Sequence, residues 1–177
     1  MEKKIEDLKM LFDEEAVQKR TKEIAAQINA TLGATEDLTV ICVLKGSSIF
    51  CCDLIKHLKM PIQLEFIKVS SYGNAQVSSG HVKALDLTLP ALKGKNVLVV
   101  EDIIDTGCTL KFLVDLIQKT HHPNFCKIVT FLNKKIARTT EIEPDFYGFE
   151  VDNKFVVGYG LDYEGYFRNL PYVGYFE

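Results

Sequence analysis

The chain has 177 residues, of which 47% are hydrophobic and 25% are charged, as in an ordinary globular protein. Its 21 basic and 24 acidic residues give a formal charge of −3 without a basic block, which argues against sequence-independent binding to nucleic acid. No apolar run reaches the ~18 residues of a membrane span, and the first residues lack the apolar core of a secretory signal. We therefore expect one cytoplasmic domain over residues 1–177, without a nucleic-acid or membrane partner.

The five cysteines show neither a metal-binding spacing nor a disulfide framework. Cys42 lies inside an apolar run, where a free thiol behaves as a small hydrophobic residue. We predict reduced thiols and no zinc site. The cysteines are Cys42, Cys51, Cys52, Cys108 and Cys126.

The first half of the chain alternates helical and strand patterns. Apolar residues at helical spacing after an acidic first turn predict an amphipathic helix over 13–32. A buried strand is predicted over 38–44, followed by the segment 46–48, a helix through 58 and a second strand over 62–69. The stretch 70–83 is rich in Ser, Gly and Asn and shows no core pattern.

The second half continues this alternation. Strands are predicted over 96–101 and 127–132, separated by a helix whose apolar residues recur from 110 to 117, and the tail from 145 onward is strand-like. Such alternation predicts the α/β class, with a parallel sheet between helices and ligands bound at the carboxyl ends of the strands. The residues expected at that edge are Lys45, 101–109 and Lys134.

An unusual acidic segment follows the strand predicted at 96–101. Glu101 and Asp102 come after four apolar residues, and Asp105 follows three residues later. Adjacent carboxylates repel each other, so local stability does not favour them. The turn 106–109 then opens a helix, where backbone N–H groups can receive a phosphate. Carboxylates beside a phosphate site indicate a divalent metal or sugar hydroxyls. The alternative, that Asp105 or Thr106 only caps the helix, leaves the acid pair unexplained.

The segment 99–107 resembles the phosphoribosyl-diphosphate signature of the type I phosphoribosyltransferases. Further segments before and after it, together with Arg168, occur in the order typical of hypoxanthine–guanine phosphoribosyltransferases. Together these segments span about 40–170. The resemblance implies the type I fold: a central, mostly parallel twisted sheet flanked by helices, with a hood from both terminal segments over the base site. The further segments are 43–46, 70–73, 132–134, 144–149 and 154–163.

The resemblance also implies a reaction. The phosphoribosyl group would pass from phosphoribosyl diphosphate to N9 of hypoxanthine or guanine, giving IMP or GMP and diphosphate in purine salvage. Glu101 and Asp102 would hold the ribose hydroxyls with Mg²⁺, Asp162 would hold a second Mg²⁺, and Asp105 would be the general base. The backbone of 105–109 would bind the 5′-phosphate, together with the hydroxyls of Thr106 and Thr109 on either side of Gly107 and Cys108.

The resemblance assigns the diphosphate and the purine to further residues. Lys45 and Gly46, after a Leu44–Lys45 bond that can be cis, would bind diphosphate together with Arg168. Lys134 would donate a hydrogen bond to the purine O6. If the register of the strand over 127–132 differs by one residue, Lys135 would take this place. Phe155 would stack on the purine, and the Val156 backbone would read its edge. Asp105, Lys134 and Arg168 form the expected catalytic set.

Ser71 and Tyr72 would close a mobile lid over 70–83 and exclude water from the reacting sugar. Each of these roles has an ordinary structural alternative. Lys45 could be an exposed surface lysine, Arg168 part of a surface ion pair, and Phe155 and Val156 part of a strand core. The stretch 70–83 could be a surface loop. A thiol at the Cys108 position, at a helix N-terminus, is expected to have a lowered pKa.

Two rival functions stay open at this stage. One is a regulator that binds phosphoribosyl diphosphate without transferring it. Against it, the sequence shows no extra helical DNA-binding segment and no basic patch, and it keeps the base-site set Lys134, Phe155 and Asp162. The other is a phosphoacceptor signalling domain, which places its acid pair after the first strand. Xanthine as the preferred base is a further alternative within the enzyme class. By resemblance, the chain is expected to form a homodimer or homotetramer.

Overall fold

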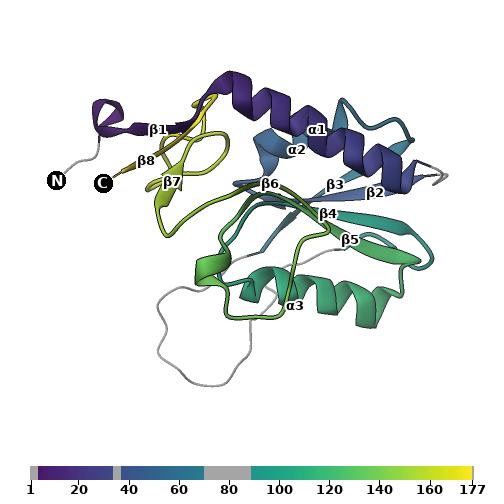
Figure 1. Cartoon of the computed structure of the whole chain (residues 1–177). Helices are drawn as coiled ribbons and strands as arrows, with labels where there is room; N and C mark the ends of the chain where they lie inside the picture. Colours follow the sequence, from purple (N-terminus) through teal and green to yellow (C-terminus); the bar gives the residue numbers. More distant parts are fainter. Residues whose placement is uncertain (1–3, 34–36, 70–88, 177) are drawn as a thin grey trace, which may run out of the picture.

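The computed structural model describes residues 4–33, 37–69 and 89–176. Its centre is a five-stranded sheet in the order β3-β2-β4-β5-β6, and every neighbouring pair is parallel (Figure 1). The strands are β2 (Leu38–Leu44), β3 (Ile62–Lys68), β4 (Asn96–Ile104), β5 (Phe125–Asn133) and β6 (Phe146–Glu150).

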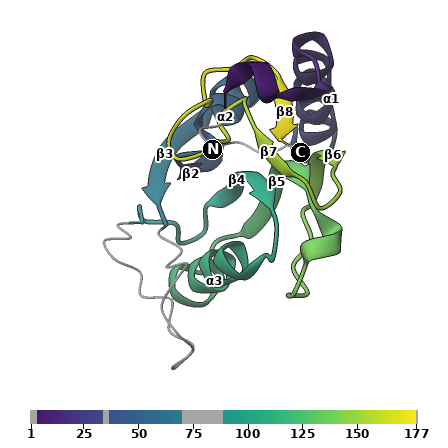
Figure 2. The same ribbon diagram turned by 90° about the vertical axis from the view of Figure 1, so that its left-hand side faces the viewer.

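Helices cover both faces of this sheet, as Figure 2 shows from the side. Helices α1 (Glu14–Leu32) and α2 (Ser48–Ile55) lie on one face, and α3 (Cys108–Leu116) lies on the other. The predicted α/β class with a flanked parallel sheet is thus confirmed. Within the described residues, no helix is long and apolar enough to cross a membrane. Short helical turns span Ile5–Asp7 and Lys135–Ala137, and a π-helical turn spans Ile117–His121.

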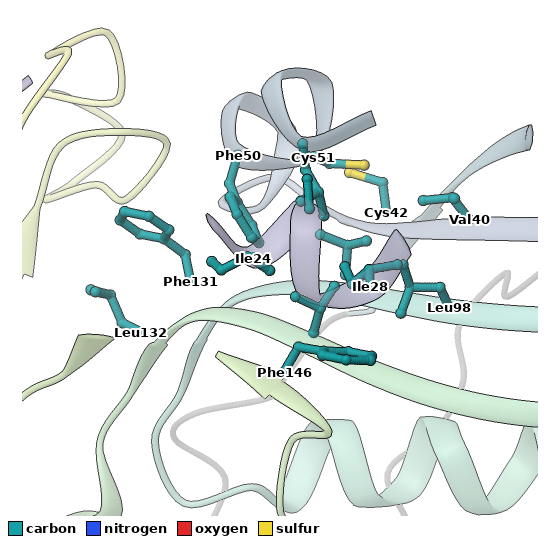
Figure 3. Packing of buried hydrophobic residues seen from close by; sticks show 14 of the residues in the cluster. Ile24, Ile28, Val40, Cys42, Phe50, Cys51, Leu98, Phe131, Leu132 and Phe146 are labelled. Carbon is teal, nitrogen blue, oxygen red and sulfur yellow. The ribbon is translucent and has the colours of Figure 1, made fainter. Parts of the chain in front are cut away.

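Helix α1 forms where its periodicity predicts. The carboxylate of Asp13 accepts a hydrogen bond from the Ala16 N–H at 2.8 Å and caps the first turn. The apolar face of α1 contributes Val17, Ile24 and Ile28, each fully buried, to the core between α1, α2 and the sheet. Figure 3 shows this core, in which Ile24 and Ile28 face Phe131 and Leu98 of the sheet.

A second, antiparallel sheet is built from the two ends of the chain. Its order is β1 (Lys9–Phe12), β8 (Val173–Phe176) and β7 (Phe155–Val157). The Phe12 ring stacks on that of Phe149 with centroids 3.9 Å apart, which ties this small sheet to the end of β6. Both terminal segments thus contribute strands to one small sheet, although the sequence pattern did not indicate β1 itself. The role of this sheet as a hood over a base site stays a prediction.

Several element boundaries differ from their predictions. Strand β4 runs to Ile104 instead of ending at Glu101, because β5 continues to pair with it up to the Ile104–Asn133 position. The acid pair therefore lies inside the strand. Helix α2 ends at Ile55 rather than at 58.

The strand order reverses between β2 and β4, which makes this the topological switch point of the sheet. Their pairing ends at the Cys42–Val100 position, so the two strands separate beyond it. Such a separation opens the crevice in which parallel sheets bind ligands.

Candidate active site

The loop after β2 and the acid pair on β4 meet in this crevice. A Cβ atom added to Gly46 would lie 1.5 Å from the Asp102 Oδ2 atom, so only glycine fits beside this carboxylate. On its other side the Gly46 carbonyl oxygen lies 2.0 Å from the position a Cβ would take on Gly160. Lys45 is exposed in the loop that follows β2. The Leu44–Lys45 peptide bond before it is cis, as the resemblance allowed. Three distant segments thus converge on Gly46.

Replacing Gly46 with alanine is expected to lower kcat/KM for phosphoribosyl diphosphate, the substrate that the sequence resemblance implies, by about 100-fold, because the added Cβ must displace Asp102. Steady-state kinetics of the purified variant measure this loss. Gly94→Ala is the control: Gly94 has a positive φ, of 69°, which Gly46 does not share, and its added Cβ would contact nothing within 4 Å. Gly94→Ala should lose some stability and keep its activity; wild-type kinetics for Gly46→Ala would contradict the prediction.

The acid pair is partly exposed and electrostatically strained. Burial and the neighbouring Asp102 charge raise the pKa of Glu101 well above its ordinary value. Burial also raises the pKa of Asp102, although hydrogen bonds from its surroundings and the charge of Arg168 oppose the rise. Two backbone bonds fix the pair: the Asp102 N–H donates to Glu101 Oε1 at 3.2 Å, and the Ile103 N–H donates to Asp102 Oδ1 at 2.7 Å.

Asp105 and Lys134 come together from the ends of β4 and β5. Lys134 Nζ lies 3.8 Å from Asp105 Oδ2, and the Lys134 backbone N–H donates to the Ile104 carbonyl at 3.0 Å. The Lys134 side chain is 11% exposed, whereas that of Asp105 is 52% exposed. A proton acceptor and a cationic donor are therefore neighbours in the crevice, with the carboxylate open to a ligand. Lys135 instead pairs with Glu150, so the register favours Lys134 as the site residue.

The turn from 105 to 109 forms the N-terminus of α3. The capping residue is Gly107, with φ of 82°, rather than Asp105 or Thr106. The turn borders a cavity of about 110 Å³. Residues lining it include Glu101, Asp105, Thr106, Gly107 and Thr109. Backbone N–H groups at a helix start and two threonine hydroxyls suit this cavity to a phosphate.

Cys108 is exposed in this turn, with its Sγ 3.6 Å from the Thr139 hydroxyl. Hydrogen bonds with Thr139 and Thr106 lower the pKa of the thiol. All five cysteines, which lie in the described part of the chain, are free thiols.

Arg168 and Asp162 pair with each other. Arg168 Nη2 lies 2.5 Å from Asp162 Oδ1, and Nη1 donates to the Gly160 carbonyl at 2.6 Å. The Asp162 Oδ2 atom also accepts from the Gly165 N–H at 2.7 Å. Because Gly160 packs on Gly46, this pair is joined to the loop at Lys45.

The base-site candidates on β7 differ in exposure. The Phe155 side chain is 53% exposed and meets Tyr163 edge-on, with centroids 5.7 Å apart, whereas Val156 is buried. Phe155 can thus offer a ring face to a planar ligand. Ser71, Tyr72 and the expected lid over 70–83 lie outside the described residues.

Sequence reasoning missed two residues that hold this site together. Tyr159 donates to Asp53 Oδ2 at 3.0 Å and lies 3.2 Å from the Thr21 hydroxyl, which fastens the loop before Asp162 to α1 and α2. Arg138 binds backbone oxygens around Asp105. Arg138 lies outside every motif, and Tyr159 lies within the segment 154–163 without a role assigned to it. Neither contact could be predicted, because the partners are distant in sequence.

A Mg²⁺ ion fits the donor set of the crevice. Within the described residues, no three His, Cys, Asp or Glu side chains gather as a ready-made metal cage. Glu101 and Asp102 instead offer hard oxygen ligands in an incomplete set, and Mg²⁺ is commonly held by one or two carboxylates with water and substrate phosphates completing its shell.

A parallel sheet with a crevice at its switch point, an acid pair and a phosphate-type turn is the architecture of a phosphoribosyltransferase. The family model described as "Phosphoribosyl transferase domain" matches residues 7–164. The chain is 46% identical to the hypoxanthine-guanine phosphoribosyltransferase of Bacillus subtilis, over 94% of this chain and 91% of the relative. The chain therefore belongs to the family of hypoxanthine–guanine phosphoribosyltransferases.

Solved structures agree with this assignment. A hypoxanthine-guanine phosphoribosyltransferase of Bacillus anthracis superposes with a TM-score of 0.87 at 41% identity, covering 96% of this chain and 98% of the other. A hypoxanthine phosphoribosyltransferase of Staphylococcus aureus gives a TM-score of 0.89 at 39% identity, covering 97% and 93%.

Proposed function

We propose that the protein transfers the phosphoribosyl group of phosphoribosyl diphosphate to N9 of hypoxanthine and of guanine, releasing IMP or GMP and diphosphate in purine salvage. The observation that carries this proposal is the pairing of Asp105 with Lys134 beside the phosphate-type turn. The Asp105 carboxylate, as base for the purine, and the Lys134 ammonium, as donor to its O6, would then lie next to a pocket suited to the 5′-phosphate.

On the sugar side, the turn 105–109 would bind the 5′-phosphate through its N–H groups and the Thr106 and Thr109 hydroxyls. Glu101 and Asp102 would accept hydrogen bonds from the two ribose hydroxyls. Bound Mg²⁺ would neutralise negative charge on the departing diphosphate. Lys45 and Arg168 would bind the same diphosphate, which requires Arg168 to exchange part of its contact with Asp162. That exchange would free the Asp162 carboxylate to bind the second Mg²⁺ ion.

On the base side, Asp105 would accept the proton of the purine imidazole ring as N9 attacks the anomeric carbon. Lys134 would donate to O6, which favours a 6-oxopurine over a 6-aminopurine, while Phe155 stacks on the ring and the Val156 backbone reads its edge. Water must be kept from the developing oxocarbenium ion. We keep closure of 70–83 by Ser71 and Tyr72 as the proposed device for this.

The proposed setting is a homodimer or homotetramer in the cytoplasm. The five free thiols support a reducing compartment. A regulator that only binds phosphoribosyl diphosphate is not favoured, because the relatives are named as transferases.

The purified protein with phosphoribosyl diphosphate and Mg²⁺ is expected to form nucleotide from hypoxanthine and guanine, with adenine at least 100-fold poorer in kcat/KM. Lys134→Gln should lower kcat/KM for hypoxanthine by about 10–100-fold, the worth of one hydrogen bond to a charged group. Chromatographic assay of nucleotide with each base, xanthine included, measures both effects.

Lys135→Gln is the matched control, since the exposed Lys135 pairs with Glu150 and should leave base use unchanged. Product from none of the four bases would refute the proposed function. Adenine or xanthine as the best substrate would overturn the assigned base preference.

A further inference from the structure

Arg138 is a charged side chain held almost out of solvent beside the site. It follows the helical turn Lys135–Ala137, and its side chain is only 8% exposed. The Glu143 carboxylate lies 3.4 Å from the Arg138 Nη1 atom, and the Glu143 side chain is 60% exposed. Such a weak partner does not explain why the guanidinium is buried, because a buried charge is costly unless its donors are satisfied.

The guanidinium donors are directed instead at neutral oxygens around the active site. Arg138 Nε donates to the Asp105 carbonyl at 3.1 Å, and Nη2 reaches the Ile104 carbonyl at 3.4 Å. Nη2 also donates to Asn133 Oδ1 at 2.5 Å, and Nη1 donates to the Ile142 carbonyl. One side chain thus joins the end of β4, the end of β5 and the segment that follows.

The residues next to Arg138 reinforce this connection. The Thr139 N–H donates to the Thr106 carbonyl at 3.1 Å, and the Thr140 hydroxyl donates to the same oxygen at 3.1 Å. A Cβ added to Gly107 would meet the Thr140 hydroxyl and the Arg138 side chain. The backbone of the turn 105–107 therefore rests on the segment 138–142.

Asn133 shows that this arrangement has an energetic cost. Its Oδ1 atom is used by Arg138, but its buried Nδ2 atom has no hydrogen-bond partner among the described residues. An unpaired buried donor is unfavourable, and an apolar residue would avoid it. Local stability therefore does not account for an asparagine at this position, whereas fixing the Arg138 guanidinium does.

We propose that Arg138 is a positioning residue that sets the backbone of Asp105 and Thr106 relative to Lys134. It thereby aligns the phosphate-binding turn with the base site. The inference rests on the proposed function of these residues. Arginine is suited to this task because its planar fork supplies several donors in fixed directions, which lysine cannot do.

Arg138→Lys tests the proposal, with Arg20→Lys as the matched control. Arg20 also donates to backbone carbonyls, those of Gly148 at 2.7 Å and Tyr147 at 3.0 Å, but none of its partners belongs to the site. For each protein, KM for phosphoribosyl diphosphate, kcat and the thermal midpoint are measured, and binding of phosphoribosyl diphosphate is measured separately by calorimetry.

For Arg138→Lys we expect KM for phosphoribosyl diphosphate to rise about 10-fold and kcat to fall, giving a loss of about 100-fold in kcat/KM. Arg20→Lys should lose stability with an unchanged KM, as expected of a purely structural role. Because Arg138→Lys could unfold, Asn133→Leu serves as a second variant: it removes one Arg138 anchor and should raise the same KM about 2–5-fold.

Wild-type KM values in folded Arg138→Lys and Asn133→Leu would overturn the proposal, as would equal effects in the Arg20 and Arg138 variants. The calorimetric readout separates this failure from failure of the proposed function. A wild-type protein that binds phosphoribosyl diphosphate but makes no nucleotide would refute the transferase proposal, while the binding constants of the variants would still decide the role of Arg138.

Discussion

Replacing Asp105 with asparagine is expected to lower kcat by about 10²–10⁴-fold, the usual contribution of a general base. Asparagine keeps the size and hydrogen-bonding shape of the side chain but cannot accept the purine proton. The variant should fold normally, because the ion pair it loses joins Lys134 to a carboxylate that is 52% exposed, and such pairs add little stability. KM for phosphoribosyl diphosphate should change little, since the proposed binding of the 5′-phosphate uses the backbone of the turn.

Stopped assays of nucleotide formation and a thermal melt check these expectations together. Asp115→Asn is the control: Asp115 lies on the adjacent helix α3 and pairs with Lys111, away from the crevice. A kcat for Asp105→Asn within about threefold of the wild type would remove Asp105 from its proposed role.

Replacing Glu101 with glutamine is expected to make the protein more stable and less active. At neutral pH the Glu101 carboxylate is poorly solvated and repelled by Asp102, which raises its pKa, and glutamine relieves both effects. Its amide oxygen can still accept the bond that the Asp102 N–H donates at 3.2 Å. The melting temperature should rise by about 2–4 °C for each kcal/mol gained at this chain length. Loss of the charge proposed to bind the ribose and Mg²⁺ should lower kcat/KM by about 10–100-fold.

The stability gain should depend on pH with a definite sign. Because the Glu101 pKa is higher in the folded chain than in the unfolded chain, the folded protein retains the proton as pH rises. Below the unfolded pKa, about 4.3, both states are protonated and the variant has no advantage. The advantage grows as pH rises from there through the folded pKa. Melts of both proteins across this range measure it.

Glu150→Gln provides a control of opposite sign, since its hydrogen bond with Lys135 lowers the pKa of the Glu150 carboxyl. That variant should lose rather than gain stability. A Glu101→Gln protein that is both less stable and fully active would contradict the strained, functional acid pair.

Two residues of the site, Glu101 and Asn133, are not explained by the stability of the fold. Glu101 weakens the free protein, and Asn133 leaves a buried donor without a partner in the described chain. Glu101 lies in the carboxyl-terminal half of β4, and Asn133 is the last residue of the neighbouring strand β5. Unfavourable interactions of this kind collect at functional sites, where ligand binding compensates for them.

Much of the fold could be predicted because periodicity depends on local burial. Strand β2 has the predicted bounds, and α1 differs by one residue at its start, since Val17, Ile24 and Ile28 mark its buried face. Strand β1 was missed because its two exposed residues are followed by two half-buried ones without alternation, and the strand is ordered by pairing with β8. Strand β4 was drawn too short because carboxylates rarely continue a strand, whereas pairing with β5 carries it on to Ile104.

The sequence by itself determined the alternation of strands and helices, the acid pair and the turn after it. The resemblance of 99–107 and the further segments to a known family then indicated a phosphoribosyltransferase. Only the tertiary structure decided that Gly46 and Gly160 bring the β2 loop against Asp102, and that Arg168 pairs with Asp162. It alone showed that Arg138 fastens the turn at Asp105 to the end of β5. The physical reason is that periodicity and motifs record local interactions, whereas the geometry of the crevice comes from contacts between segments far apart in the chain.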